Sequence, residues 1–139
     1  MNVLVDTSVW SLALRRSTRN LNPEEKLIVA ELAELIREGR ARVIGLVRQE
    51  LLSGIKTHEQ YQKLREALGA FEDELVDTRD YETAADLSNT CRSSGVSVSL
   101  ADMLICAVAQ QRGWAVFTTD PDFRRYARIL KISLHERRK

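Results

Sequence analysis

Five acidic residues stand where their carboxylates could act together: Asp6, Glu50, Asp102, Asp120 and Asp122. If several meet in one crevice they repel, because two unit charges about 4 Å apart oppose each other by roughly 4 kcal/mol at an effective dielectric constant near 20. A hard divalent cation removes this conflict, and ligation by oxygen alone suits Mg²⁺ or Mn²⁺. The acids therefore predict a metal site suited to phosphodiester hydrolysis, in which the metal lowers the pKa of an attacking water.

Hydroxyl groups accompany the acids along the sequence and are expected to orient water or phosphate oxygens: Thr7, Ser8, Thr118 and Thr119. The sequence offers no competing site of softer ligands. His58 and His135 are isolated and are interpreted as surface residues. Cys106 has the helical spacing of a core residue.

Four of the acids also have a purely structural interpretation at the start of a helix. Asp6 could cap a helix that follows the first apolar run. Ser99 and Asp102 have the spacing of a capping box. Asp120 and Asp122 could cap a short helix and supply a favourable charge in its first turn. Taken singly, these acids leave the choice between capping and metal binding open.

Glu50 is harder to explain as a surface charge. On a helical wheel it falls about 40° from Leu46, between Leu46 and Val47, and therefore inside an apolar arc. A carboxylate in such a position is rarely buried without a partner. A salt bridge is the ordinary partner, and a metal ion is the alternative.

Short apolar runs alternate with segments of helical spacing along the chain, which predicts right-handed βαβ units. Strands are expected at Val3–Val5, Arg42–Ile44, Leu75–Val76, Ala115–Thr118 and Ile129–Ile132. Helices are expected after Asp6, over 23–39, 46–54, 58–68, 80–94 and 99–112, and after Asp120. We expect a three-layer α/β/α sandwich with a mostly parallel sheet, in one domain over residues 1–139. Ligands of such sheets bind beyond the carboxyl ends of the strands, where several of the acids lie.

Length and composition fit an ordinary globular domain. The 139 residues are 44% hydrophobic and 29% charged, and 6 Gly and 2 Pro exclude a fibrous repeat. No apolar run approaches the roughly 18 residues that span a bilayer, and the first apolar run ends at an acid, unlike a signal peptide. Two cysteines make no disulfide framework. We expect a cytoplasmic protein with reduced thiols and no membrane association.

The net charge of +1 conceals separate basic clusters. One lies near the N-terminus, and another extends from Pro121 to Lys139. The arginines of these clusters are expected to hold the backbone of a polyanion at the rim of the acidic site. They are Arg15, Arg16, Arg19, Arg124, Arg125 and Arg128.

The chain resembles the PIN-domain ribonucleases, and among them the VapC-type toxins of type II toxin–antitoxin systems. Four segments carry the resemblance: VLVDTS at 3–8, QELLSG at 49–54, LADMLICA at 100–107 and FTTDPDF at 117–123. They occur in the order of the family and extend over nearly the whole chain. No single segment is specific to the family, but four such segments in this order, in a chain of this length, are specific.

The resemblance implies a PIN-like, Rossmann-like sandwich and a metal-dependent endoribonuclease. It implies Mg²⁺ or Mn²⁺ bound by the acids, with Asp122 as an additional or alternative ligand. The implied catalytic acids are Asp6, Glu50, Asp102 and Asp120, and the implied metal ligands include Asp6, Asp102, Asp120 and Asp122. Thr118, with Thr7 or Ser8, matches the supporting hydroxyls of the family.

The resemblance also implies partners. The expected substrate is single-stranded or looped RNA, such as transfer or ribosomal RNA, and the expected assembly is a homodimer silenced by a cognate antitoxin. Apolar side chains after the first acid are expected to line the groove for an antitoxin helix: Trp10, Leu12 and Leu14. The alternative function is a module of the same fold that binds Mg²⁺ or RNA without hydrolysis, although few aromatic residues are available for base stacking.

Overall fold

A parallel five-stranded sheet forms the centre of the molecule, with strands in the order β3-β2-β1-β4-β5. The structure is a computed structural model and describes residues 1–138, so Lys139 of the C-terminal basic cluster lies outside it. The strands are β1 (Val3–Val5), β2 (Ala41–Ile44), β3 (Asp73–Glu74), β4 (Ala115–Phe117) and β5 (Ser133–Leu134).

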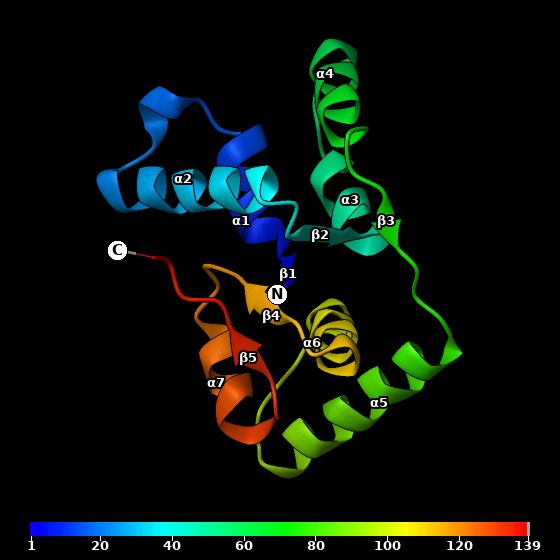
Figure 1. Ribbon diagram of the computed structural model, residues 1–139. Helices are drawn as coiled ribbons and strands as arrows, with labels where there is room; N and C mark the ends of the chain where they lie inside the picture. The colour runs from blue at the N-terminus through cyan, green and yellow to red at the C-terminus, as the bar shows by residue number, and fades with distance from the viewer. Residues whose placement is uncertain (139) are drawn as a thin grey trace.

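Helices cover both faces of the sheet, as the alternation of elements predicts (Figure 1). One face carries α1 (Thr7–Leu14), α2 (Pro23–Arg37), α3 (Gly45–Leu52) and α4 (His58–Leu68), with a short 3₁₀ helix η1 (Thr18–Asn20) between α1 and α2. The other face carries α5 (Thr78–Ser93), α6 (Leu100–Arg112) and α7 (Asp122–Ile129). The predicted three-layer α/β/α fold is therefore confirmed. Within residues 1–138, no helix is long and apolar enough to cross a membrane.

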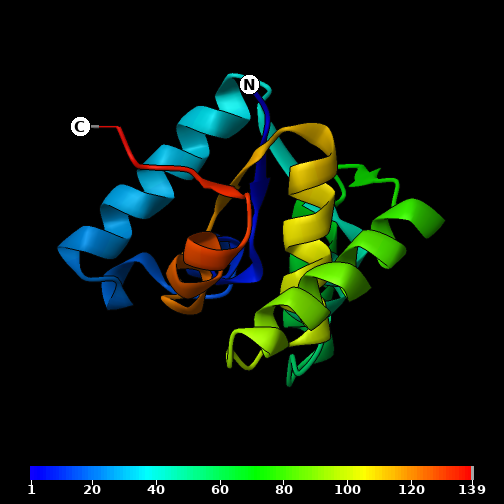
Figure 2. The ribbon, with the colours of Figure 1, turned by 90° about the horizontal axis from the view of Figure 1, so that it is seen from below.

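The core lies around β1, the middle strand of the sheet. All three residues of β1 are buried, because helices cover both of its faces. Helix α6 packs over β1 and buries an unbroken run from Met103 to Ala109, and α5 crosses α6 obliquely and packs against it (Figure 2). A capping box of Asn22 and Glu25 begins α2, and Gly113, with φ of 70°, ends α6. These local signals fix where α2 begins and where α6 ends.

Two predicted strands are displaced. The expected strand at Ile129–Ile132 is wrong, because α7 continues to Ile129 and its end is closed by the Leu130 N–H to the Tyr126 carbonyl. The strand β5 follows at Ser133–Leu134. The expected strand at Leu75–Val76 lies two residues earlier, at β3, and Leu75 is instead among the most exposed apolar residues. Apolar character alone does not distinguish a strand from the loop beside it.

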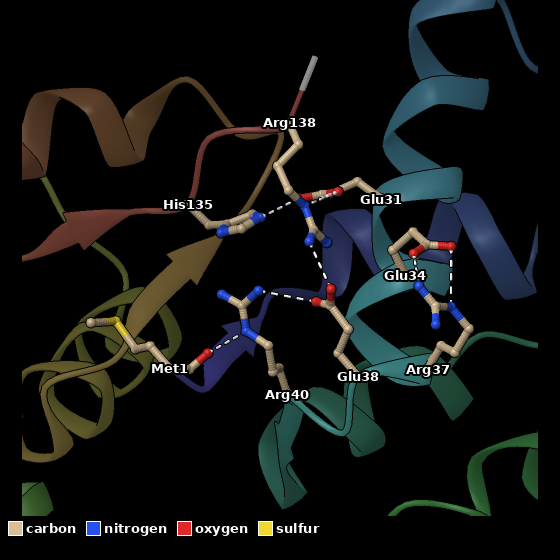
Figure 3. Close-up of polar contacts among 8 residues, drawn as sticks. All are labelled: Met1, Glu31, Glu34, Arg37, Glu38, Arg40, His135 and Arg138. Atoms are coloured by element: carbon tan, nitrogen blue, oxygen red, sulfur yellow. Dashed lines mark hydrogen bonds and ion pairs between the residues drawn. The ribbon is translucent and has the colours of Figure 1, made fainter.

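The segment after β5 contacts α2 through Glu31 (Figure 3). The Glu31 residue is only 5% exposed. His135 Nε2 lies 2.6 Å from one Glu31 oxygen, and Arg138 Nε donates to both oxygens. Burial raises the pKa of Glu31, but the hydrogen bonds from His135 and Arg138 outweigh it and hold that pKa below its usual value. The interpretation of His135 as an isolated surface residue is wrong, because its ring also packs edge-on against Phe117.

Candidate active site

The strand order reverses between β1 and β4, which is where parallel α/β sheets bind ligands beyond their carboxyl ends. Asp6 follows β1 directly, and its N–H donates to the carbonyl of Phe117 at the end of β4. Thr118, Asp120 and Asp122 follow β4. The topology thus brings the first acid and the last two acids to one edge of the sheet.

Asp6 is 6% exposed and holds no helix cap, since its side chain makes no capping hydrogen bond to α1. Two hydroxyls instead donate to Asp6 Oδ2: Ser8 Oγ at 2.9 Å and Thr118 Oγ1 at 2.8 Å. Thr118 Oγ1 also accepts the N–H of Asp120, at 3.0 Å. Two of the predicted supporting hydroxyls therefore contact Asp6, and Thr118 links Asp6 to Asp120.

The closest group of acids is Asp102, Asp120 and Asp122, each of which offers a carboxylate oxygen within 4.8 Å of the others. Asp102 comes from the first turn of α6, and the other two come from the loop after β4 and the start of α7. All three are half-buried. Asp122 is ion-paired with Arg125 on the next turn of α7, and its N–H donates to Asp120 Oδ1.

The carboxylate of Asp102 does not serve as the cap of α6. Ser99 Oγ accepts the Asp102 N–H, at 3.0 Å, and the Asp102 carboxylate accepts a hydrogen bond from the Tyr126 hydroxyl. Burial raises the pKa of Asp102, and the negative charges of Asp6 and Asp120 raise it further, against the opposing effect of Tyr126. The carboxylates here therefore repel one another, and a bound cation would relieve that repulsion.

The donor set fits a hard divalent cation. Asp102, Asp120 and Asp122 each offer a carboxylate oxygen, and no histidine or cysteine belongs to the group. Asp6 lies outside this group of close oxygens but near enough to affect the pKa of Asp102. Its place as a ligand stays a prediction.

Glu50 does not belong to the close group of Asp102, Asp120 and Asp122. It is exposed on α3, and its Oε1 accepts a hydrogen bond from Thr7 Oγ1 at 2.8 Å. The predicted burial in an apolar arc is wrong, because α3 turns Val47 and Leu51 into the core while Leu46 remains partly exposed. The contact with Thr7, the residue after Asp6, places Glu50 at the border of the site.

The six predicted RNA-binding arginines differ in their immediate surroundings. Arg16 is paired with Glu25, at 2.9 Å, and Arg125 with Asp122. Arg124 is exposed and lines a groove of about 590 Å³ that also contains Asp120. The remaining three are also exposed: Arg15, Arg19 and Arg128. Binding of RNA by these arginines stays a prediction.

Tyr126 is the site residue that the sequence did not reveal. It is buried on α7 and reaches Asp102 across 24 residues of sequence. Its only signal is its position one helical turn after Asp122, on the same buried side as Phe123, where an aromatic residue is typical of a core contact. Nothing in that pattern specifies a use for the hydroxyl group.

The comparisons with known proteins agree with this fold. The family model for the PIN domain matches residues 3–129. The chain therefore belongs to the PIN-domain family. Among curated proteins it is similar to Ribonuclease VapC11 of Mycobacterium tuberculosis and VapC ribonuclease Mb1587 of Mycobacterium bovis. Each is 29% identical over 136 residues, which is 94% of this chain and 95% of the relative.

Solved structures show the same fold. FitAcB from Neisseria gonorrhoeae has a TM-score of 0.76 at 23% identity, and the match covers 96% of each chain. VapBC2 from Rickettsia felis, bound to a DNA fragment from its promoter, has a TM-score of 0.73 at 18% identity and covers 97% of this chain and 98% of the other.

Proposed function

We propose that this protein is a metal-dependent endoribonuclease and the toxin of a toxin–antitoxin pair. The observation that carries the proposal is the cluster of Asp102, Asp120 and Asp122 at the edge of the sheet where the strand order reverses. Membership of the PIN-domain family and the ribonuclease names of the curated relatives support it. An RNA substrate implies that the protein acts in the cytoplasm.

The residues of the site have separable tasks in this proposal. When bound, Mg²⁺ or Mn²⁺ would polarise the scissile phosphoryl group and lower the pKa of the attacking water. Asp102, Asp120 and Asp122 would hold the cation, with Asp6 as a further carboxylate beside them. Ser8 and Thr118 fix the orientation of Asp6 through their hydrogen bonds. Glu50, held by Thr7, would act at the border of the site on water or RNA.

RNA cleavage by the purified protein tests this proposal. We expect cleavage of single-stranded or looped RNA in Mg²⁺ or Mn²⁺, and its loss when a chelator removes the metal, because without the cation the acids repel the phosphate and nothing lowers the pKa of the attacking water. Binding of Mn²⁺ and RNA without cleavage would instead favour the non-catalytic module. Equal cleavage with and without chelator would contradict metal dependence.

We also propose a homodimer formed through α5 and the start of α6. Leu100 is 81% exposed and Tyr81 57%, both unusual for large apolar side chains. They flank an apolar groove of about 460 Å³ whose lining includes Leu46, Ala84 and Met103. An exposed apolar surface of this kind is typical of an interface, and a two-fold axis would pack it against itself.

Leu100→Glu is expected to convert the dimer into a monomer. The change places a charge on the proposed interface, while an acid in the first turn of a helix is favourable for α6 itself. Light scattering during size-exclusion chromatography measures the mass. Leu27→Glu, at an exposed leucine on α2, is the matched control and should leave the dimer intact. A wild type that is monomeric at all concentrations contradicts this interface.

The antitoxin is proposed to bind a groove between the end of α1 and α4. This groove of about 400 Å³ combines apolar residues such as Leu14 and Leu64 with basic residues at its rim. The rim carries Arg15, Lys56 and Lys63, so a segment with apolar anchors and acidic neighbours fits it. Trp10, expected in this groove, is 1% exposed and packs edge-on against Phe71 in the core, so that expectation is wrong.

A further inference from the structure

The hydroxyl of Tyr126 lies at the acid cluster although its ring belongs to the core. Tyr126 is 1% exposed, and its ring packs edge-on against Phe123 with ring centroids 5.3 Å apart. Its Oη donates to Asp102 Oδ2, at 2.8 Å. The side chain thus joins α7 to the first turn of α6, where the cluster of acids lies.

Packing alone does not account for a tyrosine at this position. A phenylalanine would fill the same space against Phe123, and burying a hydroxyl costs free energy unless it finds a partner. In the described residues, the partner of the Tyr126 hydroxyl is the Asp102 carboxylate. The presence of the Tyr126 hydroxyl is therefore best explained by its effect on the Asp102 carboxylate, which belongs to the candidate metal site.

The hydrogen bond fixes how Asp102 presents its charge. A carboxylate on α6 can rotate about its side-chain bonds, and the negative charges of Asp6 and Asp120 favour rotation away from the cluster. With Oδ2 held by Tyr126, the rotation is restricted and Oδ1 remains free of this bond. Ligands held by a second group in this way need less ordering when a metal binds.

We propose that Tyr126 is a positioning residue for the metal site: its hydroxyl holds Asp102 in the orientation in which that carboxylate, with Asp120 and Asp122, receives a divalent cation. The proposal rests on the metal dependence within the proposed function, but it concerns binding of the metal and not the substrate. The same hydrogen bond also ties α7, which carries Asp122, to α6, which carries Asp102.

The test compares Tyr126→Phe with the wild type by calorimetric titration with Mn²⁺ in the absence of RNA. We expect the variant to bind Mn²⁺ about 10- to 100-fold more weakly, the range typical for loss of a group that orients a metal ligand. Circular dichroism and cooperative melting of the metal-free variant establish that it is folded. Tyr61→Phe on α4 is the matched control and should bind Mn²⁺ as the wild type does.

A second measurement separates positioning from structural damage. RNA cleavage by Tyr126→Phe is followed against Mn²⁺ concentration, and we expect the concentration for half-maximal cleavage to rise while the rate at saturating Mn²⁺ recovers. Unchanged Mn²⁺ affinity in folded Tyr126→Phe overturns this inference and leaves the proposed function standing. Conversely, if Tyr126→Phe weakens Mn²⁺ binding but the wild type never cleaves RNA, the nuclease is overturned and the inference stays intact. A wild type that binds no Mn²⁺ overturns both.

Discussion

The Asp102→Asn variant is expected to be at least as stable as the wild type in metal-free buffer and to lose RNA cleavage. Stability is retained because one negative charge is removed from beside Asp6 and Asp120, whose repulsion already raises the pKa of Asp102. The hydrogen bonds survive, since asparagine keeps an oxygen for Tyr126 and the N–H that donates to Ser99. Loss of an ordinary capping acid would instead destabilise the fold mildly.

Mn²⁺ should raise the melting temperature of the wild type more than that of the variant. The proposed Mn²⁺ site exists only in the folded state, so Mn²⁺ at 100 times its dissociation constant is expected to stabilise the wild type by about 2.7 kcal/mol, whereas the variant should respond weakly. Cleavage should fall by about a hundredfold or more, since loss of a ligand exceeds the effect typical of losing a group that orients one. Thermal melting in chelator and in Mn²⁺, beside a cleavage assay, gives both results.

Asp86→Asn is the matched control for this experiment. Asp86 is an exposed acid on α5 and does not belong to the acid cluster, so the same loss of one charge should change neither the metal response nor cleavage. If the wild type shows no shift in melting temperature at millimolar Mn²⁺ and cleaves RNA equally well in chelator, the metal site is contradicted.

The elements that the sequence predicts well are those with strong local signals. Helix α2 begins at a capping box after Asn22, and α6 ends at Gly113, whose positive φ favours glycine. The central strand β1 has a β-branched run buried on both faces. The edge strands β3 and β5 consist of two residues each and are set by pairing with neighbouring strands. Local residue types carry little information about such pairing.

The sequence predicts only part of the site. The rule that parallel sheets bind ligands at their carboxyl edge is sufficient to bring Asp6 and Asp120 together. The structure places Asp102, Asp120 and Asp122, all predicted as ligands, in the closest group. It leaves Glu50 outside this group, because the direction of a side chain on α3 depends on tertiary packing. Tyr126 could not be found from sequence patterns, because its contact with Asp102 depends on how two helices cross.

A second cluster of charges, away from the acid site, joins β3, α5 and α6 through Arg112. Arg112 binds Asp80 with two parallel hydrogen bonds, at 2.9 and 3.0 Å, and also reaches Glu74 and the carbonyls of Leu75 and Val108. Asp80 is 2% exposed, so its charge depends on this arginine. The hydrogen bonds from Arg112 hold the pKa of Asp80 below its usual value, against the effect of burial.

Arg112→Met is expected to destabilise the fold by about 3–5 kcal/mol, the cost typical of leaving one partner of a buried ion pair uncompensated. Methionine keeps much of the apolar volume of the arginine side chain, so most of the loss reflects the unpaired Asp80. Urea unfolding of the two proteins at neutral pH measures the difference. Adding Asp80→Asn to Arg112→Met should restore much of the stability, because it removes the unpaired charge and retains an oxygen for the Asp77 N–H.

The pH dependence of the unfolding free energy tests the same prediction independently. In the wild type the pKa of Asp80 is lower in the folded than in the unfolded state, so its stabilising contribution is present above the unfolded value of about 3.9 and is lost as pH falls through the folded value. In Arg112→Met, burial without a cation raises that pKa above the unfolded value, so protonation on acidification relieves the variant. The difference in unfolding free energy should therefore shrink between neutral and acidic pH. A difference that stays constant over this range would show that Arg112 stabilises the fold by packing and not through the charge of Asp80.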